Sequence, residues 1–205
     1  MKSILVINDI SGLGNCSMAA NLPIFTKMGY YCMPLPTAVF NCQTGFDGFK
    51  VMPNSSVADF ADGMTSRRKP DSVYVGFCND TRTLAEVATV LTSVNCVDSC
   101  KIVDPVMGDN GKLYPVFDSD YVDEMKRVVR LADYITPNVT EACLLAGIDY
   151  AALAANIGRE SFVDTCLAAF ADFTNLVGCK NAVITGVDCG IRIVNIVLEQ
   201  GKQPV

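Results

Sequence analysis

The sequence predicts an α/β fold in which a mostly parallel sheet is wound with helices on both faces. Short runs of β-branched residues alternate with longer amphipathic stretches along all 205 residues. No linker rich in Gly, Ser or Pro and no internal repeat interrupts this alternation. We therefore expect a single domain over residues 1–205, with a small lid over residues 31–50.

Each element follows from a local pattern. Strands are expected at residues 3–7, 72–77, 101–103, 134–135, 182–184 and 192–198, which are short apolar runs. Residues 30–39 are extended but carry two prolines, which favour an edge strand or a lid. Helices are expected at residues 17–28, 55–66, 81–94, 119–132, 142–146 and 161–176. Gly29 and Gly147 end two of them, and Asn138 with Glu141 has the spacing of a capping box.

Composition excludes several classes of function. The chain contains no histidine, which rules out a Ser-His-Asp triad, a His general base and a His-ligated zinc. Sixteen basic against 22 acidic residues give a net charge of −6, and the longest basic run is residues 67–69. This balance argues against a nucleic-acid or anionic-membrane partner and favours a small molecule.

Ten cysteines lie scattered through apolar segments without a C-x-x-C pair. We interpret them as reduced, buried small residues of a cytoplasmic protein. The sequence has no signal peptide and no apolar run of the length that crosses a bilayer.

Polar residues follow the predicted strands, where ligands bind in open α/β sheets. These residues are Asn8, Asp9, Asp104, Asp109, Thr136, Asn138, Thr185 and Gly186. Carboxylates suit a hard cation, while hydroxyls, amides and helix N-termini suit phosphate oxygens. The set therefore favours a magnesium nucleotide.

Other interpretations of single motifs stay open at this point. Asn138 and Glu141 could be a helix cap alone, Asp104 a turn former, and Asp109 a solvated loop carboxylate. Gly12-x-Gly14-x-x-Ser17 lacks the third glycine of a dinucleotide fingerprint. The Gly-Lys pair that ends at Lys112 is followed by Leu113, which excludes a Walker motif.

Taken together, three motifs resemble the pyridoxal kinase branch of the ribokinase-like superfamily, and within it the bacterial pyridoxamine kinases. They are Asp104-Pro-Val-Met-Gly-Asp109, Ile135-Thr-Pro-Asn-x-x-Glu141 and Val183-Ile-Thr-Gly186. Asn8-Asp-Ile-Ser-Gly-Leu-Gly, the run that begins at Leu35, and Thr44-Gly-Phe resemble the same branch.

The resemblance implies ATP-dependent phosphorylation of the 5′-hydroxymethyl of pyridoxal, pyridoxamine or pyridoxine, in vitamin B6 salvage, by a homodimer that uses Mg²⁺ and a monovalent cation, K⁺ or Na⁺. It assigns substrate binding to Asn8, Asp9, Gln43 and Thr44. It assigns nucleotide binding to Asp104, Asn138, Glu141, Thr185 and Gly186, and metal binding to Asp109, Thr136 and Glu141.

The sequence departs from this family in two places. Gln43 stands where the family commonly has His, and it cannot titrate or carry charge. The family's Gly-Thr-Gly-Asp motif, which supplies an anion hole and the catalytic Asp, does not occur within the 205 residues. We therefore expect a C-terminally truncated kinase domain whose base would lie beyond Val205, and which is inactive as it stands.

Two alternatives accompany this interpretation. One is the hydroxymethylpyrimidine kinase of thiamine synthesis, which shares the fold and much of the motif order. The other is a non-catalytic module that binds a B6 vitamer or a nucleotide and regulates another process. The second alternative predicts a cooperative melt with stabilisation by ligand, whereas a fragment with an uncovered sheet edge should aggregate.

Overall fold

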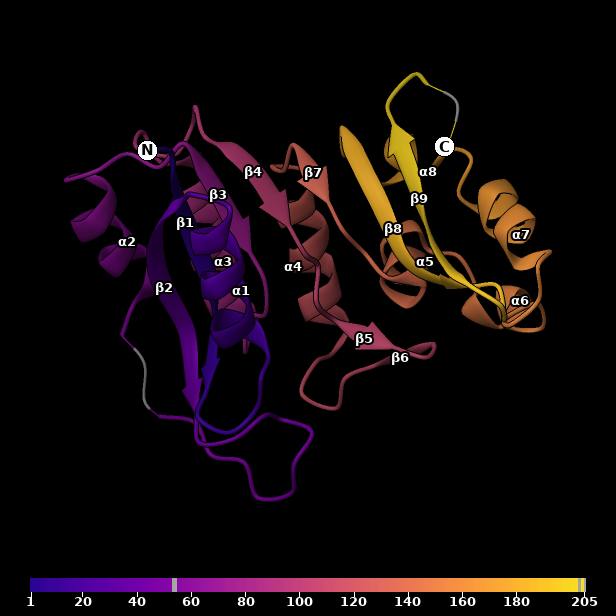
Figure 1. Cartoon of the computed structure of the whole chain (residues 1–205), viewed down its shortest axis with the longest axis horizontal. Helices are drawn as coiled ribbons and strands as arrows, with labels where there is room; N and C mark the ends of the chain where they lie inside the picture. Colours follow the sequence, from indigo (N-terminus) through magenta and orange to yellow (C-terminus); the bar gives the residue numbers. More distant parts are fainter. Residues whose placement is uncertain (53–54, 203, 205) are drawn as a thin grey trace. The chain divides into compact units, whose positions relative to one another are not determined.

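The computed structural model describes residues 1–52, 55–202 and 204, and its chain forms two compact units (Figure 1). Unit 1 comprises Met1–Asp104 and unit 2 comprises Pro105–Val205. None of the helices in the described ranges has the length and apolar character needed to cross a membrane.

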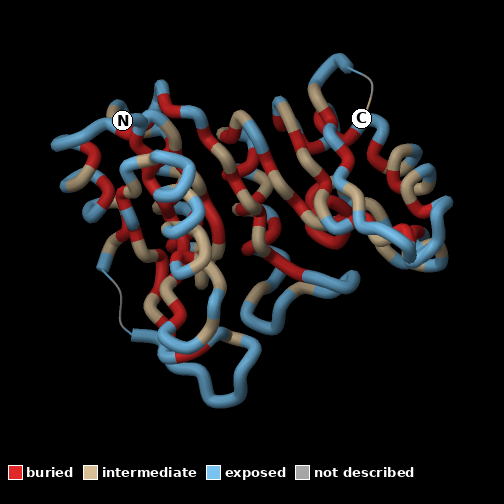
Figure 2. The backbone as a smooth tube through the Cα atoms, viewed as in Figure 1, coloured by how far each residue is buried: buried red, intermediate tan, exposed pale blue. Residues whose placement is uncertain are grey.

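Unit 1 is built on parallel strands in the order β2-β1-β3-β4. The strands are β1 (Ser3–Ser11), β2 (Tyr31–Phe40), β3 (Ser72–Val75) and β4 (Cys100–Val103). The helices are α1 (Ser17–Lys27), α2 (Val57–Thr65) and α3 (Thr81–Thr92). The apolar centre of β1 is buried, as expected for a strand with neighbours on both sides (Figure 2). Met18 of α1 packs on Ile4 and Val6.

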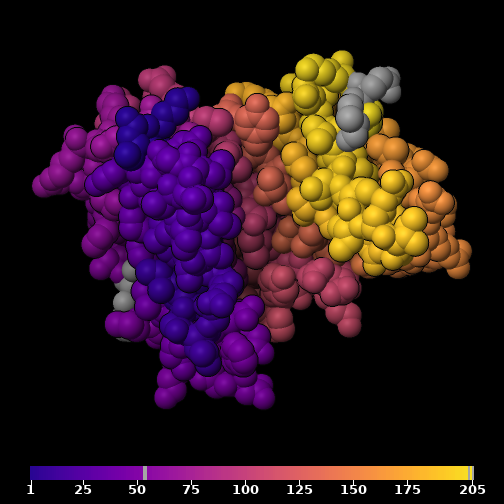
Figure 3. Space-filling model, viewed as in Figure 1, coloured from indigo at the N-terminus to yellow at the C-terminus, as the bar shows by residue number. Residues whose placement is uncertain are grey.

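Strand β2 is the edge of this order, and it carries Pro34 and Pro36. The two prolines occupy alternate positions, so their missing N–H groups lie on one side of the strand, which an edge strand can leave unpaired. Residues 31–40 of the predicted lid therefore belong to the sheet. Residues 41–50 form a loop that extends beyond the carboxyl ends of β1 and β2 (Figures 1 and 3).

Unit 2 contains β7 (Tyr134–Ile135), β8 (Asn181–Asp188) and β9 (Ile193–Glu199), together with a hairpin of β5 (Gly108–Asp109) and β6 (Lys112–Leu113). Strand β8 pairs parallel with β7 and antiparallel with β9. The helices are α4 (Ser119–Val129), α5 (Val139–Ala146), α6 (Tyr150–Ala154), α7 (Phe162–Ala169) and α8 (Phe173–Val177). The prediction of a mostly parallel, helix-flanked α/β fold is confirmed.

The single helix predicted over residues 161–176 is wrong, because the structure breaks it into α7 and α8. Phe170 leaves helical geometry at φ −103°, ψ 15°. Phe170 and Phe173 are both fully buried and meet edge to face at 5.7 Å. The bend therefore lets both rings lie in the core. Burial of the two rings stabilises the fold more than the helix propensity of these few residues would.

The hairpin of β5 and β6 was not predicted, although its turn carries a signal. Asn110 has φ 50° and Gly111 has φ 76°, the two positive values that Asn-Gly adopts in a tight hairpin. A Cβ on Gly111 would run into the ring of Tyr150 on α6, so glycine is required there for a second reason.

Seven of the ten cysteines are buried. Burial raises the pKa of the Cys143 and Cys179 thiols to about 11 and that of Cys166 to about 12, so these thiols stay protonated near neutral pH. Their surroundings agree with the expected role as small buried residues. Cys100 is the exposed exception.

Candidate active site

Asn8 lies toward the carboxyl end of β1, and both its side-chain oxygen and its side-chain nitrogen form hydrogen bonds within the chain. Asn8 Oδ1 accepts hydrogen bonds from Asp9 N and from Phe77 N, each at 2.9 Å. Its Nδ2 donates to Asn21 Oδ1 of α1 at 2.6 Å. Asn8 thus ties the ends of β1 and β3 to α1. Gly76 makes room for it, because a Cβ there would come within 2.5 Å of Asn8 Nδ2.

Asp9 is 4% exposed and differs from Asn8 in one respect. Its Oδ2 accepts a hydrogen bond from Ser11 Oγ at 3.1 Å. Its Oδ1 is buried and has no hydrogen-bond partner among the described residues. A buried carboxylate oxygen without a donor is costly, and such groups gather where a ligand supplies the missing bond.

The loop of residues 41–50 begins beside this strand end. Asn41 Oδ1 accepts from Lys50 N at 2.5 Å and Asn41 N donates to Lys50 O, which closes the loop at its neck. Gln43 N donates to Leu13 O at 2.9 Å. The structure therefore places Gln43 against the turn that follows β1, and Thr44 comes next in the same loop.

An aromatic group lies at the same end of unit 1. The ring of Phe40 meets that of Phe77 edge to face at 6.1 Å between centroids, and that of Phe49 at 6.0 Å. Thr37 Oγ1 donates to Phe77 O at 2.7 Å. Neither Phe77 nor Phe40 is among the site residues that the sequence predicts. Their positions at the ends of β2 and β3 were the signal that could have identified them.

Asn138 and Glu141 form the predicted capping box at the start of α5. Asn138 Oδ1 accepts from Glu141 N, and Glu141 Oε2 accepts from Asn138 N, both at 2.9 Å. The structure adds two bonds to a neighbouring loop. Glu141 Oε1 accepts from Met107 N at 3.0 Å, and Asn138 Nδ2 donates to Gly108 O at 2.9 Å.

The remaining predicted residues of unit 2 lie around this cap. Asn138 pairs with Thr185 in an isolated parallel bridge, and Thr185 N donates to Pro137 O at 2.8 Å. Gly186 has φ 71° and open space where a Cβ would stand. Asp109 is exposed, and its carboxylate accepts from the N and Nδ2 of Asn110. Thr136 directly precedes Pro137 in the short connection between β7 and α5.

Asp104 ends unit 1 one residue after β4. Tyr74 OH donates to its Oδ2 at 3.4 Å. Burial raises the pKa of Tyr74 above its ordinary value, and the negative charge of Asp104 raises it further. Tyr74 therefore stays protonated and can keep donating to Asp104.

The three residues predicted to bind metal do not form a cage by themselves. Within the described part of the chain, no three His, Cys, Asp or Glu side chains gather in a metal-binding group. Glu141 is 3% exposed and both of its oxygens already accept backbone N–H groups.

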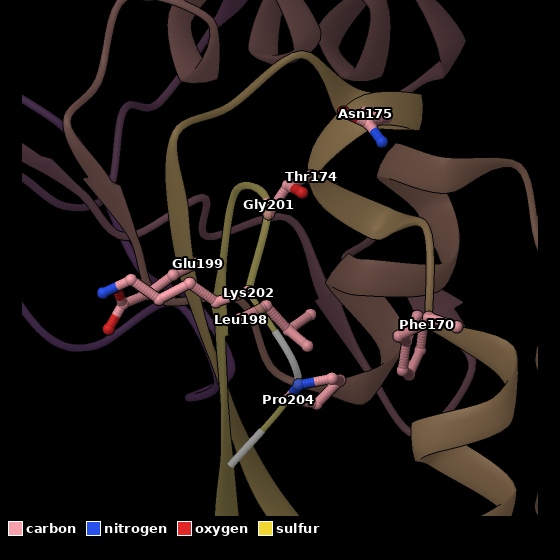
Figure 4. A pocket seen from close by; sticks show the side chains of 9 residues that line it. Phe170, Thr174, Asn175, Leu198, Glu199, Gly201, Lys202 and Pro204 are labelled. Atoms are coloured by element: carbon pink, nitrogen blue, oxygen red, sulfur yellow. The ribbon is translucent and has the colours of Figure 1, made fainter.

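A hollow of about 160 Å³ opens elsewhere in unit 2 (Figure 4). It is lined by Phe170, Ala171, Thr174, Asn175, Leu198, Glu199, Gly201, Lys202 and Pro204. Leu198 and Glu199 pair with the first residues of β8, so the hollow lies at the amino end of that strand. None of the predicted site residues lines it, and ligands of open α/β sheets bind at the opposite end.

Comparisons with known proteins identify the family and agree with the fold. Residues 13–203 match the family described as Phosphomethylpyrimidine kinase. The chain is 34% identical over 128 residues to the pyridoxal kinase of Arabidopsis thaliana, covering 59% of this chain and 41% of that relative. It is 28% identical over 186 residues to the thiamine biosynthesis bifunctional protein ThiED of Geobacter sulfurreducens, covering 90% of this chain and 35% of that relative.

A solved structure of another protein has a similar fold. A protein of Bacteroides thetaiotaomicron described as a phosphomethylpyrimidine kinase, in an orthorhombic crystal form with pyridoxal, superposes with a TM-score of 0.83 at 29% identity. The superposition covers 99% of this chain and 70% of that one. This chain spans less than half the length of the two curated relatives. The family match nevertheless runs through both units, and the chain therefore belongs to the phosphomethylpyrimidine kinase family.

Proposed function

We propose that this chain is the substrate-binding and nucleotide-binding part of a kinase that phosphorylates the 5′-hydroxymethyl of a B6 vitamer, with ATP as donor. The curated pyridoxal kinase and the neighbour solved with pyridoxal support this substrate class. A homodimer and a cytoplasmic location are part of the proposal through the family resemblance alone.

The observation that carries the proposal is the unpartnered oxygen of Asp9. It lies at the carboxyl end of β1, near Ser11 and the turn that Gln43 contacts. The ring of a B6 vitamer offers a protonated nitrogen and a hydroxyl as donors, and either can complete the hydrogen bonding of a carboxylate. We assign the ring to Asp9, Gln43 and Thr44, while Asn8 supports this end of the strand.

The nucleotide is assigned to unit 2, with Asp104 as a further nucleotide-side carboxylate. Asn138 follows β7 and pairs with Thr185 within β8, and the next residue, Gly186, has open space where a Cβ would stand. Their amide, hydroxyl and backbone groups suit phosphate oxygens, because phosphoryl transfer needs mainly positioning and charge neutralisation. Asp109 and Thr136 are proposed to face Mg²⁺ or the monovalent cation, K⁺ or Na⁺.

Hydroxymethylpyrimidine phosphorylation in thiamine synthesis is the second candidate. The description of the matching family and the Geobacter sulfurreducens relative favour it. The amino group of a pyrimidine could also donate a hydrogen bond to Asp9. The Asp9 carboxylate therefore does not by itself distinguish the two substrates.

Titration calorimetry separates the two substrates. We expect the 205-residue chain to bind pyridoxal and pyridoxine saturably, and hydroxymethylpyrimidine at least about tenfold more weakly, which corresponds to about 1.4 kcal/mol. Pyridoxine lacks the aldehyde and therefore controls for imine formation with surface lysines. Tighter binding of hydroxymethylpyrimidine would assign the chain to thiamine synthesis, and binding of neither ring would refute the proposal.

The same preparation tests catalysis. The 205 residues contain no Gly-Thr-Gly-Asp, and Gly186-Val-Asp188 does not supply that pattern. With ATP, Mg²⁺ and pyridoxal we expect turnover at least about 100-fold below that of the Arabidopsis thaliana pyridoxal kinase, because a general base contributes about 10²–10⁴-fold. Comparable turnover would show that residues within this chain complete the catalytic site.

A further inference from the structure

We propose that Glu141 is a positioning residue that fixes the loop at Met107 and Gly108 on the N-terminus of α5, and that it acts on the nucleotide through this backbone instead of as a magnesium ligand. The proposal rests on the nucleotide-binding part of the proposed function. It concerns contacts within unit 2 only.

Both oxygens of the Glu141 carboxylate are committed to backbone donors. Oε2 accepts from Asn138 N at 2.9 Å, which is the bond of an ordinary capping box. Oε1 accepts from Met107 N at 3.0 Å, and Met107 lies 34 residues earlier in the chain. A helix cap explains the first bond but not the second. The carboxylate therefore joins two distant segments.

The side chain of Asn138 joins the same two segments, residues 107–108 and the start of α5. Its Oδ1 accepts from Glu141 N, and its Nδ2 donates to Gly108 O at 2.9 Å. It also pairs with Thr185 of β8. The side chains of Asn138 and Glu141 thus hold the segment at residues 107–108 on the start of α5, and a backbone bridge joins Asn138 to Thr185 of β8.

The hairpin of β5 and β6 is also held against the N-terminus of α5. Gly111 N donates to Thr140 Oγ1 at 2.9 Å, so a third side chain of the same helix end holds the turn. A Cβ on Gly108 would run into Lys112 O across the hairpin, which shows how closely its strands approach. Asp109 lies between these fixed points, so its position depends on the cap.

Only a carboxylate of this length satisfies both donors. Glutamine has one acceptor oxygen, and its NH₂ group would face one of the two N–H groups. Aspartate is shorter by one methylene. Because Glu141 is 3% exposed and already accepts from two N–H groups, the structure leaves it little capacity to bind a cation directly.

The test compares Glu141→Gln with Glu86→Gln. Glu86 on α3 is a matched control, since its Oε2 accepts from Val57 N at 2.6 Å and from Ala58 N at 3.3 Å at the start of α2 in unit 1. Burial acts to raise the pKa of Glu86, but the bonds from Ala58, Ser56 and Val57 outweigh it and leave the pKa below its ordinary value. Both substitutions therefore remove a carboxylate that holds a helix N-terminus.

ADP binding is measured with excess Mg²⁺ and again with EDTA. We expect Glu141→Gln to weaken ADP about tenfold under both conditions, and Glu86→Gln to leave both affinities unchanged. A loss seen only with Mg²⁺ would identify Glu141 as a metal ligand and overturn the proposal. Unchanged affinity under both conditions would overturn it as well.

Amide hydrogen exchange gives a second measurement that does not need a nucleotide. Exchange at Met107 N and Asn138 N is expected to accelerate in Glu141→Gln and not in Glu86→Gln. If Glu141→Gln fails to fold, Asn138→Ser replaces it. Serine keeps the helix cap but loses the bond to Gly108 O. Faster amide exchange is then expected in residues 107–111. Unchanged exchange would contradict the positioning role. If wild-type chain binds no ADP, the nucleotide assignment fails while exchange still decides the role of Glu141.

Discussion

Asp9→Asn is expected to weaken pyridoxal binding by about 10- to 100-fold while leaving the free energy of unfolding unchanged or higher. A hydrogen bond to a charged group contributes about 1.5–3 kcal/mol, and the ligand would lose this bond. The folded chain would lose a buried carboxylate with an unpartnered oxygen, which removes a desolvation cost. Pyridoxal affinity should therefore fall while the free energy of unfolding stays the same or rises.

Calorimetric titration and urea unfolding of both chains measure the two effects. Asp80→Asn is the matched control, because Asp80 caps α3 by accepting from Thr83 N, and asparagine caps a helix about as well. It should change neither quantity by much. Wild-type affinity in Asp9→Asn would remove Asp9 from the binding site. Lower stability with wild-type affinity would make it a structural residue.

Gly76→Ala is expected to lower the free energy of unfolding by about 2–3 kcal/mol, the range of an overpacked core. The new Cβ would come within 2.5–2.8 Å of the three terminal atoms of the Asn8 side chain. Asn8 would have to move, and its bonds to Phe77 N and Asn21 Oδ1 would be lost or distorted. Pyridoxal affinity should fall with stability, since Asn8 also holds the start of Asp9.

Gly63→Ala provides the control for this substitution. Gly63 lies within α2, and nothing is within 4 Å of the place where its Cβ would stand. Alanine in such a helical position should stabilise the chain by about 0.5–1 kcal/mol. Urea unfolding of the two variants should give changes of opposite sign. Equal stability of Gly76→Ala and wild type would show that Asn8 is free to rearrange.

Local patterns were enough to predict most elements of the fold. The apolar run of β1, the glycine that ends α5 and the spacing of Asn138 with Glu141 all act over a few residues, and the structure has each of them. The two prolines of β2 pointed to an edge for the same reason, because a missing N–H is a local property.

Features that depend on distant contacts could not be predicted in this way. The bond from Met107 N to Glu141 spans 34 residues, so the spacing of the capping box did not reveal it. Asn8 and Asp9 are neighbours with the same predicted role, yet Phe77 and Asn21 occupy the amide of one while the carboxylate of the other keeps an unpartnered oxygen. Only the packing of strands and helices separates these two residues.

We propose that a B6 vitamer binds at the carboxyl ends of β1 and β2 in unit 1. Chemical-shift mapping of the ¹⁵N-labelled chain with pyridoxine tests it most directly. We expect saturable shifts at Asp9, Ser11, Gln43 and Phe77, and none of comparable size around Phe170 and Leu198 at the hollow in unit 2. Shifts confined to that hollow, or no saturable shifts in unit 1, would contradict it.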